Sequence, residues 1–209
     1  MARTRSQDYD SIKQAIMQAA AKLFADRSFE ATSINEIAEA AGLSKAGIYH
    51  YFESKTEILR VMLTEHLESV TEIVDTALNT SDAPRDKFLT LTRLLIENYT
   101  QPSSRNQHSV LVNDIGGLSP KDREFIVATE RRIIRATERL LQSLFPQLNE
   151  HPDVLQPITM LYFGMINWTD TWFSDKGRLS PPQLATLAAE LILNGIAHTD
   201  YATLRQASK

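Results

Sequence analysis

The sequence predicts an all-α fold of about nine helices, with a small three-helix head followed by a larger helical domain. Apolar residues recur at steps of three and four along most of the chain, which is the period of an amphipathic helix. Only 7 glycines and 8 prolines interrupt the 209 residues, and most fall between the periodic segments. No segment of useful length alternates apolar and polar residues as a strand would.

Helix-start signals define the first elements. An amphipathic helix is expected over 10–27, after a mobile arm at 1–8. Ser33 and Glu36 have the spacing of a capping box, so a short helix should begin there. Gly42 is expected to end it in the left-handed conformation that glycine adopts without strain.

The rest of the chain is predicted from similar caps and from prolines at helix starts, where the missing N–H costs nothing. Helices are predicted over 44–51, 54–79, 84–100, 105–115, 120–144, 153–173 and 182–198, and loops over 101–107 and 174–180.

Composition indicates an ordinary globular protein, with 43% hydrophobic and 23% charged residues. The chain has no cysteine, no apolar run of roughly 20 residues and no apolar stretch near its N-terminus, so we expect a cytoplasmic protein without a membrane partner. The net charge of −4 gives no indication of nucleic acid, and basic and acidic residues balance within 1–60. A nucleic-acid-binding function must therefore be inferred from where individual basic and polar residues lie along the sequence.

The stretch GLSKAGIYHYFESK, residues 42–55, combines two glycines and two serines with three aromatic residues. Two short helices joined by a tight turn at Gly42 form a helix-turn-helix pattern, whose second helix enters the major groove of DNA. Ile48 and Phe52, four residues apart, should face inward. The pattern thus predicts a DNA-reading helix with Tyr49, His50 and Tyr51 on its outer side or rim, and Tyr51 fits a core position equally well.

The chemistry of these positions suits DNA. Lys45 is the long hydrogen-bond donor at the helix start, where lysine can donate to guanine. The small Ala46 lets the helix approach the bases closely. Tyr49 and His50 can bond phosphate oxygens, and Lys55 adds a positive charge at the start of the next helix.

The motif T-S-I-x-E-I-A-x-A-A-G-L-S-x-x-x-I-Y-x-Y-F-x-S-K-x-x-I-L, within a match from Ile12 to Leu59, resembles the DNA-binding signature of the TetR (tetracycline-repressor-like) family. The resemblance implies a homodimeric repressor with a DNA-binding domain at 9–54 and an effector-binding and dimerisation domain at 55–202. Carried over position by position, it assigns base contacts to Lys45, Ala46 and Asn35, and phosphate contacts to Ser33, Ser44, Tyr49, His50 and Lys55. Many members have an aromatic residue followed by histidine, the reverse of His50-Tyr51, so either of these two could contact phosphate.

The second half of the chain carries the apolar surface that a dimer needs. The segment 153–173 is apolar nearly all round and must be covered on every face. Ala188 and Gly195 lie seven residues apart in 182–198 and allow close helix contact. We expect these two helices to pair with their symmetry mates as a four-helix bundle. The predicted interface residues are Met165, Trp172, Leu184, Ala188, Leu191 and Gly195.

An effector pocket is predicted in the same region. Asn167 interrupts the apolar segment, and a buried polar group needs a partner, either across the dimer or on an effector. The predicted pocket residues are Tyr162, Asn167, Trp168 and Arg135.

The effector class is indicated by a second resemblance. The tracts LVNDIGGLSPKDREF (111–125) and YFGMINWTDTWF (162–173) resemble the TetR branch that responds to acyl-CoA thioesters. Arg131, Arg135 and Arg139 share one helix face, and arginine suits the phosphates of coenzyme A. The alternative is a solvated face on which these arginines pair with glutamates such as Glu130 and Glu138.

Other function classes explain less of the sequence. The five histidines are scattered, Gly116-Gly117 is not a phosphate-binding loop, and no nucleophile motif is present, so we expect neither an enzyme nor a cofactor or metal site. A helical interaction module without DNA binding leaves residues 42–55 unexplained. Together with the two resemblances, the sequence predicts a repressor that a small-molecule effector releases from a near-palindromic DNA operator. The resemblance to the acyl-CoA-responsive branch implies that this effector is an acyl-CoA thioester of fatty-acid or aromatic-acid catabolism.

Overall fold

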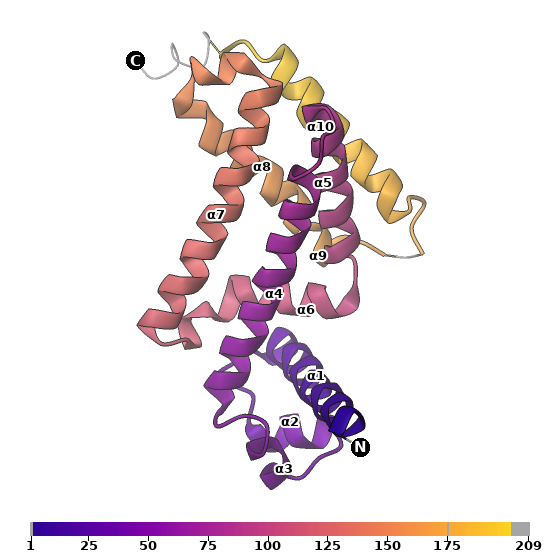
Figure 1. Cartoon of the computed structure of the whole chain (residues 1–209), viewed down its shortest axis with the longest axis vertical. Helices are drawn as coiled ribbons and strands as arrows, with labels where there is room; N and C mark the ends of the chain where they lie inside the picture. Colours follow the sequence, from indigo (N-terminus) through magenta and orange to yellow (C-terminus); the bar gives the residue numbers. More distant parts are fainter. Residues whose placement is uncertain (1, 175, 202–209) are drawn as a thin grey trace. The chain divides into compact units, whose positions relative to one another are not determined.

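The computed structural model describes residues 2–174 and 176–201, with side chains from Asp8 onward except Asp170. All regular structure in these ranges is helical, which confirms the predicted fold class (Figure 1). The α-helices are α1 (Ala2–Arg27), α2 (Ile34–Ala40), α3 (Lys45–Tyr49), α4 (Lys55–Leu78), α5 (Pro84–Tyr99), α6 (Pro102–Asp114), α7 (Pro120–Leu144), α8 (Pro152–Asn167), α9 (Thr169–Trp172) and α10 (Pro181–His198). Two short 3-10 helices are η1 (Ile115–Gly117) and η2 (Pro146–Asn149). No helix in the described ranges is long and apolar enough to cross a membrane.

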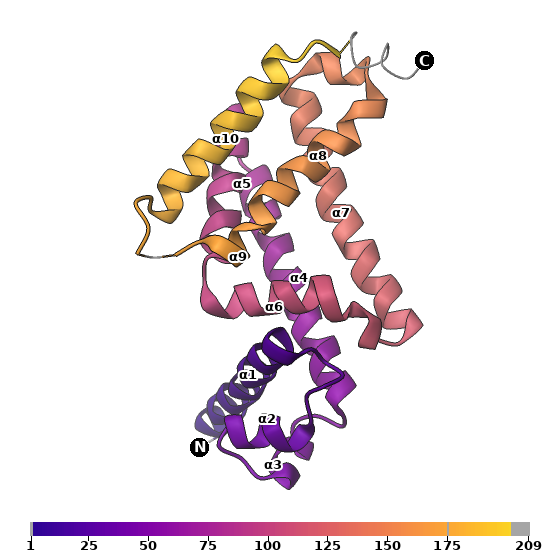
Figure 2. The ribbon, with the colours of Figure 1, turned by 180° about the vertical axis from the view of Figure 1, so that it is seen from behind.

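The chain forms two compact units. The first contains the residues up to Glu68 together with Gln101–Thr129, and therefore α1–α3, the first part of α4, α6 and the start of α7. In it α1 packs against α2 and α6, and α2 packs against α3 (Figures 1 and 2). Its core is apolar, and its largest fully buried side chains include Phe24, Ile37, Ile48, Ile58 and Met62. The predicted head, 9–54, lies within this unit.

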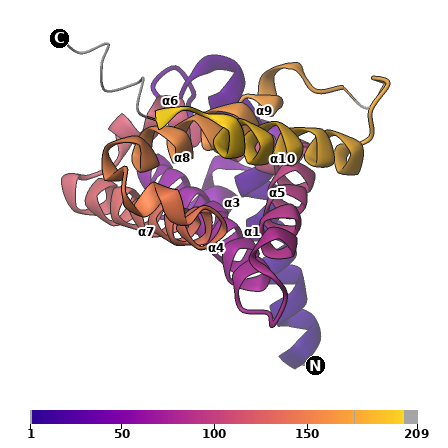
Figure 3. The ribbon, with the colours of Figure 1, turned by 90° about the horizontal axis from the view of Figure 1, so that it is seen from above.

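The second unit contains Ser69–Thr100 and the residues from Glu130 onward. In it α5 packs against α10 and α8 (Figure 3). Tyr162 is fully buried, and its hydroxyl lies 3.0 Å from the Thr92 hydroxyl, which donates to the Phe88 carbonyl over 2.8 Å. This pair satisfies two polar groups inside an otherwise apolar core. The predicted end of the second domain, residue 202, lies outside the described residues.

Two predicted non-helical segments are helical. The expected mobile arm belongs to α1, which begins at Ala2, because no glycine or proline interrupts residues 2–27. The expected loop at 101–107 is mostly the first half of α6. That helix begins at Pro102, where proline is tolerated, and the polar residues 103–107 are exposed or half-buried. The described residues of 174–180 are non-helical, as predicted.

The helix predicted over 153–173 is broken at Trp168 into α8 and α9. The Thr169 hydroxyl donates to the Ile166 carbonyl over 2.7 Å, and the Thr171 hydroxyl donates to the Trp168 carbonyl over 2.8 Å. Side-chain bonds of this kind compete with the helical ladder, and here two of them flank the break.

Candidate nucleic-acid interface

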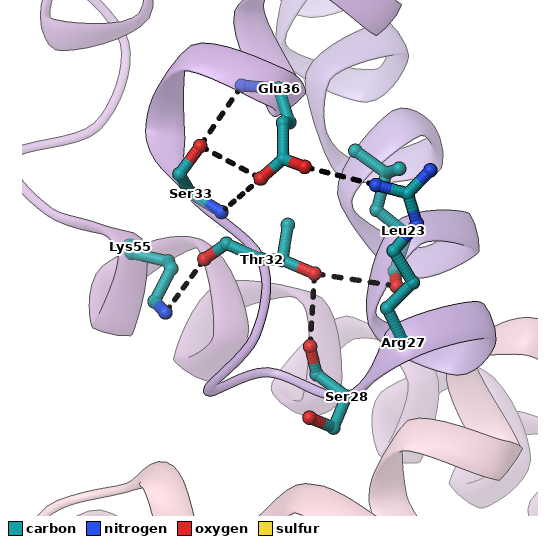
Figure 4. Close-up of polar contacts among 7 residues, drawn as sticks. All are labelled: Leu23, Arg27, Ser28, Thr32, Ser33, Glu36 and Lys55. Atoms are coloured by element: carbon teal, nitrogen blue, oxygen red, sulfur yellow. Dashed lines mark hydrogen bonds and ion pairs between the residues drawn. The ribbon is translucent and has the colours of Figure 1, made fainter.

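The start of α2 is fixed by the predicted capping box. The Glu36 N–H donates to the Ser33 hydroxyl oxygen over 3.3 Å, and the Ser33 N–H donates to the Glu36 carboxylate over 2.8 Å (Figure 4). The bond from the Ser33 backbone, and then the bond that the Ser33 hydroxyl donates to the carboxylate, lower the pKa of Glu36. The nearby Arg27 guanidinium, which pairs with Glu36 at 2.9 Å, acts in the same direction. Glu36 is therefore a carboxylate that anchors α2.

The turn between α2 and α3 depends on Gly42, whose φ is +68°. An L-residue is strained in this left-handed region, and glycine is not. The Leu43 N–H then donates to the Ala38 carbonyl over 2.8 Å, and the Gly47 N–H donates to the Ser44 hydroxyl oxygen over 3.1 Å. The second helix, α3, thus begins at Lys45 after a four-residue turn, 41–44, with the geometry that the sequence predicted.

The short α3 turns one side inward and the other outward. Ile48 and Phe52 are buried, as expected from their spacing. The other predicted contact residues of this region are exposed, with Tyr49 49% exposed: they are Asn35, Ser44, Lys45, Ala46, Tyr49 and His50. The side chains predicted to read bases, and most of those predicted to hold phosphates, are therefore accessible on the surface of the first unit.

Tyr51, for which core and surface positions were both possible, is half-buried. The centroid of its ring lies 4.7 Å from that of Tyr9 in α1 and 5.2 Å from that of His50, which it meets edge-on. His50 is the more exposed of the two. Sequence reasoning missed Tyr9, because nothing in the local pattern connects the start of α1 with the end of α3.

Lys55 and Ser33 differ from their predicted roles. The Lys55 ammonium donates to the carbonyl of Phe29 over 2.6 Å. It also donates to the carbonyl of Thr32 over 2.8 Å (Figure 4). The Ser33 hydroxyl donates to the Glu36 carboxylate over 2.8 Å. In both residues the side chain that was expected to hold phosphate makes a hydrogen bond within the protein: Lys55 with the carbonyls of two buried residues, and Ser33 with the Glu36 carboxylate.

The predicted effector residues lie in different places. Tyr162 is in the core between α5 and α8, where burial raises its pKa, and Trp168 is 65% exposed. Asn167 is half-buried, and its side-chain oxygen is buried without a hydrogen-bond partner. Arg135 lines a cleft of about 260 Å³ whose walls come from α4 and α7. Arg132 and Arg139 line the same cleft; the exposed Arg131, placed by the sequence on the same stripe, does not.

The predicted dimer residues divide into exposed and buried groups. Leu191 and Trp172 are 59% and 55% exposed, Gly195 is exposed, and Met165 is half-buried. Leu184 and Ala188 are buried within the protomer, so their assignment to the interface is wrong. Because α10 packs against α5, its inward face uses the small and apolar residues that the sequence pattern placed outside. Other exposed apolar side chains in this region are Met160 and Leu161 of α8, Trp168 between α8 and α9, and Leu187 of α10.

Comparisons with known proteins agree with this architecture. Residues 16–62 match the family model "Bacterial regulatory proteins, tetR family", and residues 81–196 match "Tetracyclin repressor-like, C-terminal domain". The crystal structure of a TetR-family transcriptional regulator from Bordetella parapertussis is 36% identical and covers 90% of this chain and 97% of that chain, with a TM-score of 0.83.

Two further relatives have more specific descriptions. The transcriptional repressor KstR2 of Mycolicibacterium smegmatis is 24% identical over 194 residues, which are 90% of this chain and 92% of that protein. The crystal structure of AibR in complex with isovaleryl coenzyme A and operator DNA is 26% identical and covers 86% of this chain and 97% of that chain, with a TM-score of 0.74. These relatives are transcriptional regulators, as the sequence predicted, and not enzymes. The chain belongs to the TetR family of bacterial transcriptional regulators.

Proposed function

We propose that this protein is a repressor that binds a near-palindromic operator as a homodimer and leaves it when an acyl-CoA thioester binds. The observation that carries the proposal is the outward face of α3, which follows a capped α2 and a glycine turn and exposes Lys45, Tyr49 and His50. A helix held in this way, with exposed donors, suits the major groove. The name of the KstR2 relative supports repression.

Base reading is assigned to Lys45, Ala46 and Asn35, all exposed. Phosphate contacts are assigned to Ser44, Tyr49 and His50, whose hydroxyl or imidazole groups are hydrogen-bond donors. The Ser44 oxygen accepts the Gly47 N–H, which leaves its hydroxyl hydrogen for a phosphate oxygen. Phosphate contacts by the Ser33 and Lys55 side chains require exchange of the internal bonds that these groups now make.

Dimerisation is assigned to the exposed apolar side chains of α8, α9 and α10. Leu161 and Trp168 are 70% and 65% exposed, and Leu191 is 59% exposed. Large apolar side chains that gather on a surface are typical of protein interfaces. Two copies related by a two-fold axis would cover them and would supply two α3 helices for two operator half-sites.

Effector binding is assigned to the second unit. The buried side-chain oxygen of Asn167 can accept a hydrogen bond from a ligand. Arg132, Arg135 and Arg139 make one wall of the α4–α7 cleft basic, which suits the phosphates of coenzyme A. The structure of AibR with isovaleryl coenzyme A supports this ligand class. A thioester that prefers the conformation unable to bind the operator would release the DNA by population shift.

Calorimetric titration of the full chain with isovaleryl-CoA and longer acyl-CoA thioesters tests the effector assignment. Arg135→Ala and Arg139→Ala should each weaken binding about tenfold, the effect of losing one charge-assisted contact. Arg131→Ala is the matched control, because Arg131 is exposed on the same helix outside the cleft, and it should bind as the wild type does. Equal affinity for all four proteins would contradict the assignment of the cleft, and no binding of any thioester would contradict the ligand class.

A further inference from the structure

Phe29 lies in the connection between α1 and α2 and is contacted from two other segments of the first unit. This connection is tightly bent: the preceding residue, Ser28, has a φ of +77°, and the Thr32 hydroxyl donates to the Ser28 carbonyl over 2.9 Å (Figure 4). The Phe29 ring is buried against Phe24 of α1, with 5.3 Å between the ring centroids. The conformation of this connection sets where α2 begins.

Both polar groups of the Phe29 backbone are held by charged side chains. The Phe29 N–H donates to the Asp114 carboxylate at the end of α6 over 3.1 Å, and the Phe29 carbonyl accepts the Lys55 ammonium at the start of α4 over 2.6 Å. The same ammonium lies 4.2 Å from the centroid of the Phe29 ring. Hydrogen bonds to charged groups are stronger than neutral ones, so three segments are joined at this residue.

Gly117, in η1 directly after α6, lies against the ring of Phe29. A Cβ atom on Gly117 would lie 2.6 Å and 2.7 Å from two carbons of the Phe29 ring and 3.1 Å from a methyl carbon of Leu59. The neighbouring Gly116 faces open space, with nothing within 4 Å of the same added atom. The absence of a side chain at position 117 is therefore required by Phe29, whereas at position 116 it is not.

We infer that Asp114 and Gly117 are positioning residues for operator recognition, and that through Phe29 they fix the start of the DNA-binding helix pair to the end of α6. A shift of the segment 114–117 then moves Phe29 directly, and with it the capped start of α2. The inference rests on the proposed DNA-binding function. The contact between the end of α6 and Phe29 acts on the α1–α2 connection. It is separate from the residues assigned to DNA contact.

Hydrogen exchange on the full chain tests the link without DNA. In Asp114→Ala the peptide covering residues 28–33 should exchange about tenfold faster, because the Phe29 amide loses a charged acceptor. Asp114→Asn keeps a side-chain oxygen at the same place but removes its charge, so its exchange rate should lie between those of the wild type and Asp114→Ala. Unchanged exchange in Asp114→Ala would overturn the link.

Operator binding by the full chain tests the positioning role. Gly117→Ala should weaken binding about tenfold or more and change the preferred spacing of the two half-sites, whereas Gly116→Ala should change neither. A general loss of stability would lower affinity equally at every spacing. The double variant Gly117→Ala/Phe29→Leu removes the ring and should recover part of the affinity.

The outcomes separate the two proposals. If the wild type binds no operator, the proposed function fails, and the positioning role fails with it. If the wild type binds and Gly117→Ala matches Gly116→Ala in affinity and spacing, the positioning role alone is overturned. If Gly117→Ala does not fold, the operator affinity of Asp114→Ala relative to Asp114→Asn decides, and equal affinities would overturn the role.

Discussion

The Lys55 ammonium donates to the carbonyl oxygen of Thr32 over 2.8 Å, one residue before the N-cap of α2, and also donates to the Phe29 carbonyl. A lysine that the sequence assigned to a DNA phosphate thus ties α4 to the α1–α2 connection. Lys55→Met keeps the aliphatic stem and removes the donor. It should lower the free energy of unfolding by about 1.5–3 kcal/mol, the range for hydrogen bonds to charged groups.

The salt dependence of DNA binding separates this internal role from a phosphate contact. Each neutralised phosphate contributes about −0.9 to the slope of log K against log salt concentration. Lys55→Met should leave that slope unchanged, because its ammonium is engaged inside the protein. A slope flatter by about one unit would instead assign Lys55 to a phosphate. Denaturant unfolding and fluorescence anisotropy at several salt concentrations measure the two quantities.

Lys45 should control sequence preference. Lys45→Ala is expected to lower discrimination at one base pair of each half-site by about 1–3 kcal/mol, because one donor to a base edge is lost. Tyr49→Phe should instead weaken binding to all sequences alike, because a hydroxyl on a phosphate carries no sequence information. Binding to a set of operator variants with single base changes measures both. Unchanged preference in Lys45→Ala would show that α3 docks in another register.

His66 and His108 should make stability depend on pH. Burial, with a smaller effect of His108, lowers the pKa of His66 to about 3, and burial lowers that of His108 to about 4. Their rings lie 5.8 Å apart. In the unfolded chain both histidines take up a proton near pH 6.5, whereas in the folded chain they stay neutral at that pH. The contribution of the neutral, buried histidines to the free energy of unfolding is therefore complete above pH 6.5. It is lost progressively as the pH falls toward 4, by up to about 1.4 kcal/mol per pH unit for each histidine.

Variants of these histidines test the assignment. His66→Gln/His108→Gln should show a shallower fall in the free energy of unfolding between pH 6.5 and 4.5, whatever its stability at neutral pH. His50→Gln is the control, because His50 is exposed, and it should retain the wild-type slope. Denaturant titrations at several pH values measure these slopes, and equal slopes for all three proteins would exclude the buried pair as their source.

The dimer surface can be tested by placing a charge on it. Leu191→Asp and Leu161→Asp should each dissociate the homodimer, because a buried unpaired carboxylate costs several kcal/mol. Val112→Asp changes another exposed apolar residue, on α6 in the first unit, and should leave the dimer intact. Sedimentation equilibrium gives the mass of each. If the exposed apolar surface of α8–α10 is not the dimer interface, all three variants will associate as the wild type does.

The sequence predicted the parts of the fold that local signals determine. The Ser33–Glu36 capping box, the left-handed Gly42 and the Ser44 cap each involve residues within four positions, and the structure has all three. Exposure of Lys45 and Tyr49 followed from the burial of Ile48 and Phe52.

The errors concern contacts between distant segments. The pattern of α10 is apolar on most of its faces, so it could not show that Leu184 and Ala188 face into the protomer. Nothing near Lys55 in sequence indicates Phe29 or Thr32, which lie more than 20 residues earlier and accept its hydrogen bonds. Gly117 was visible as one of a glycine pair, but only the packing of the Phe29 ring distinguishes it from Gly116.

The most direct test of operator binding and its release is fluorescence anisotropy on DNA from immediately upstream of the protein's own gene, with and without a panel of acyl-CoA thioesters. We expect tight, salt-sensitive binding that one thioester reverses and that Lys45→Ala weakens. Binding that no thioester disturbs would retain the DNA-binding role and contradict the effector class. Absence of binding to this DNA, together with absence of preference for any sequence in a random pool, would contradict the proposed function itself.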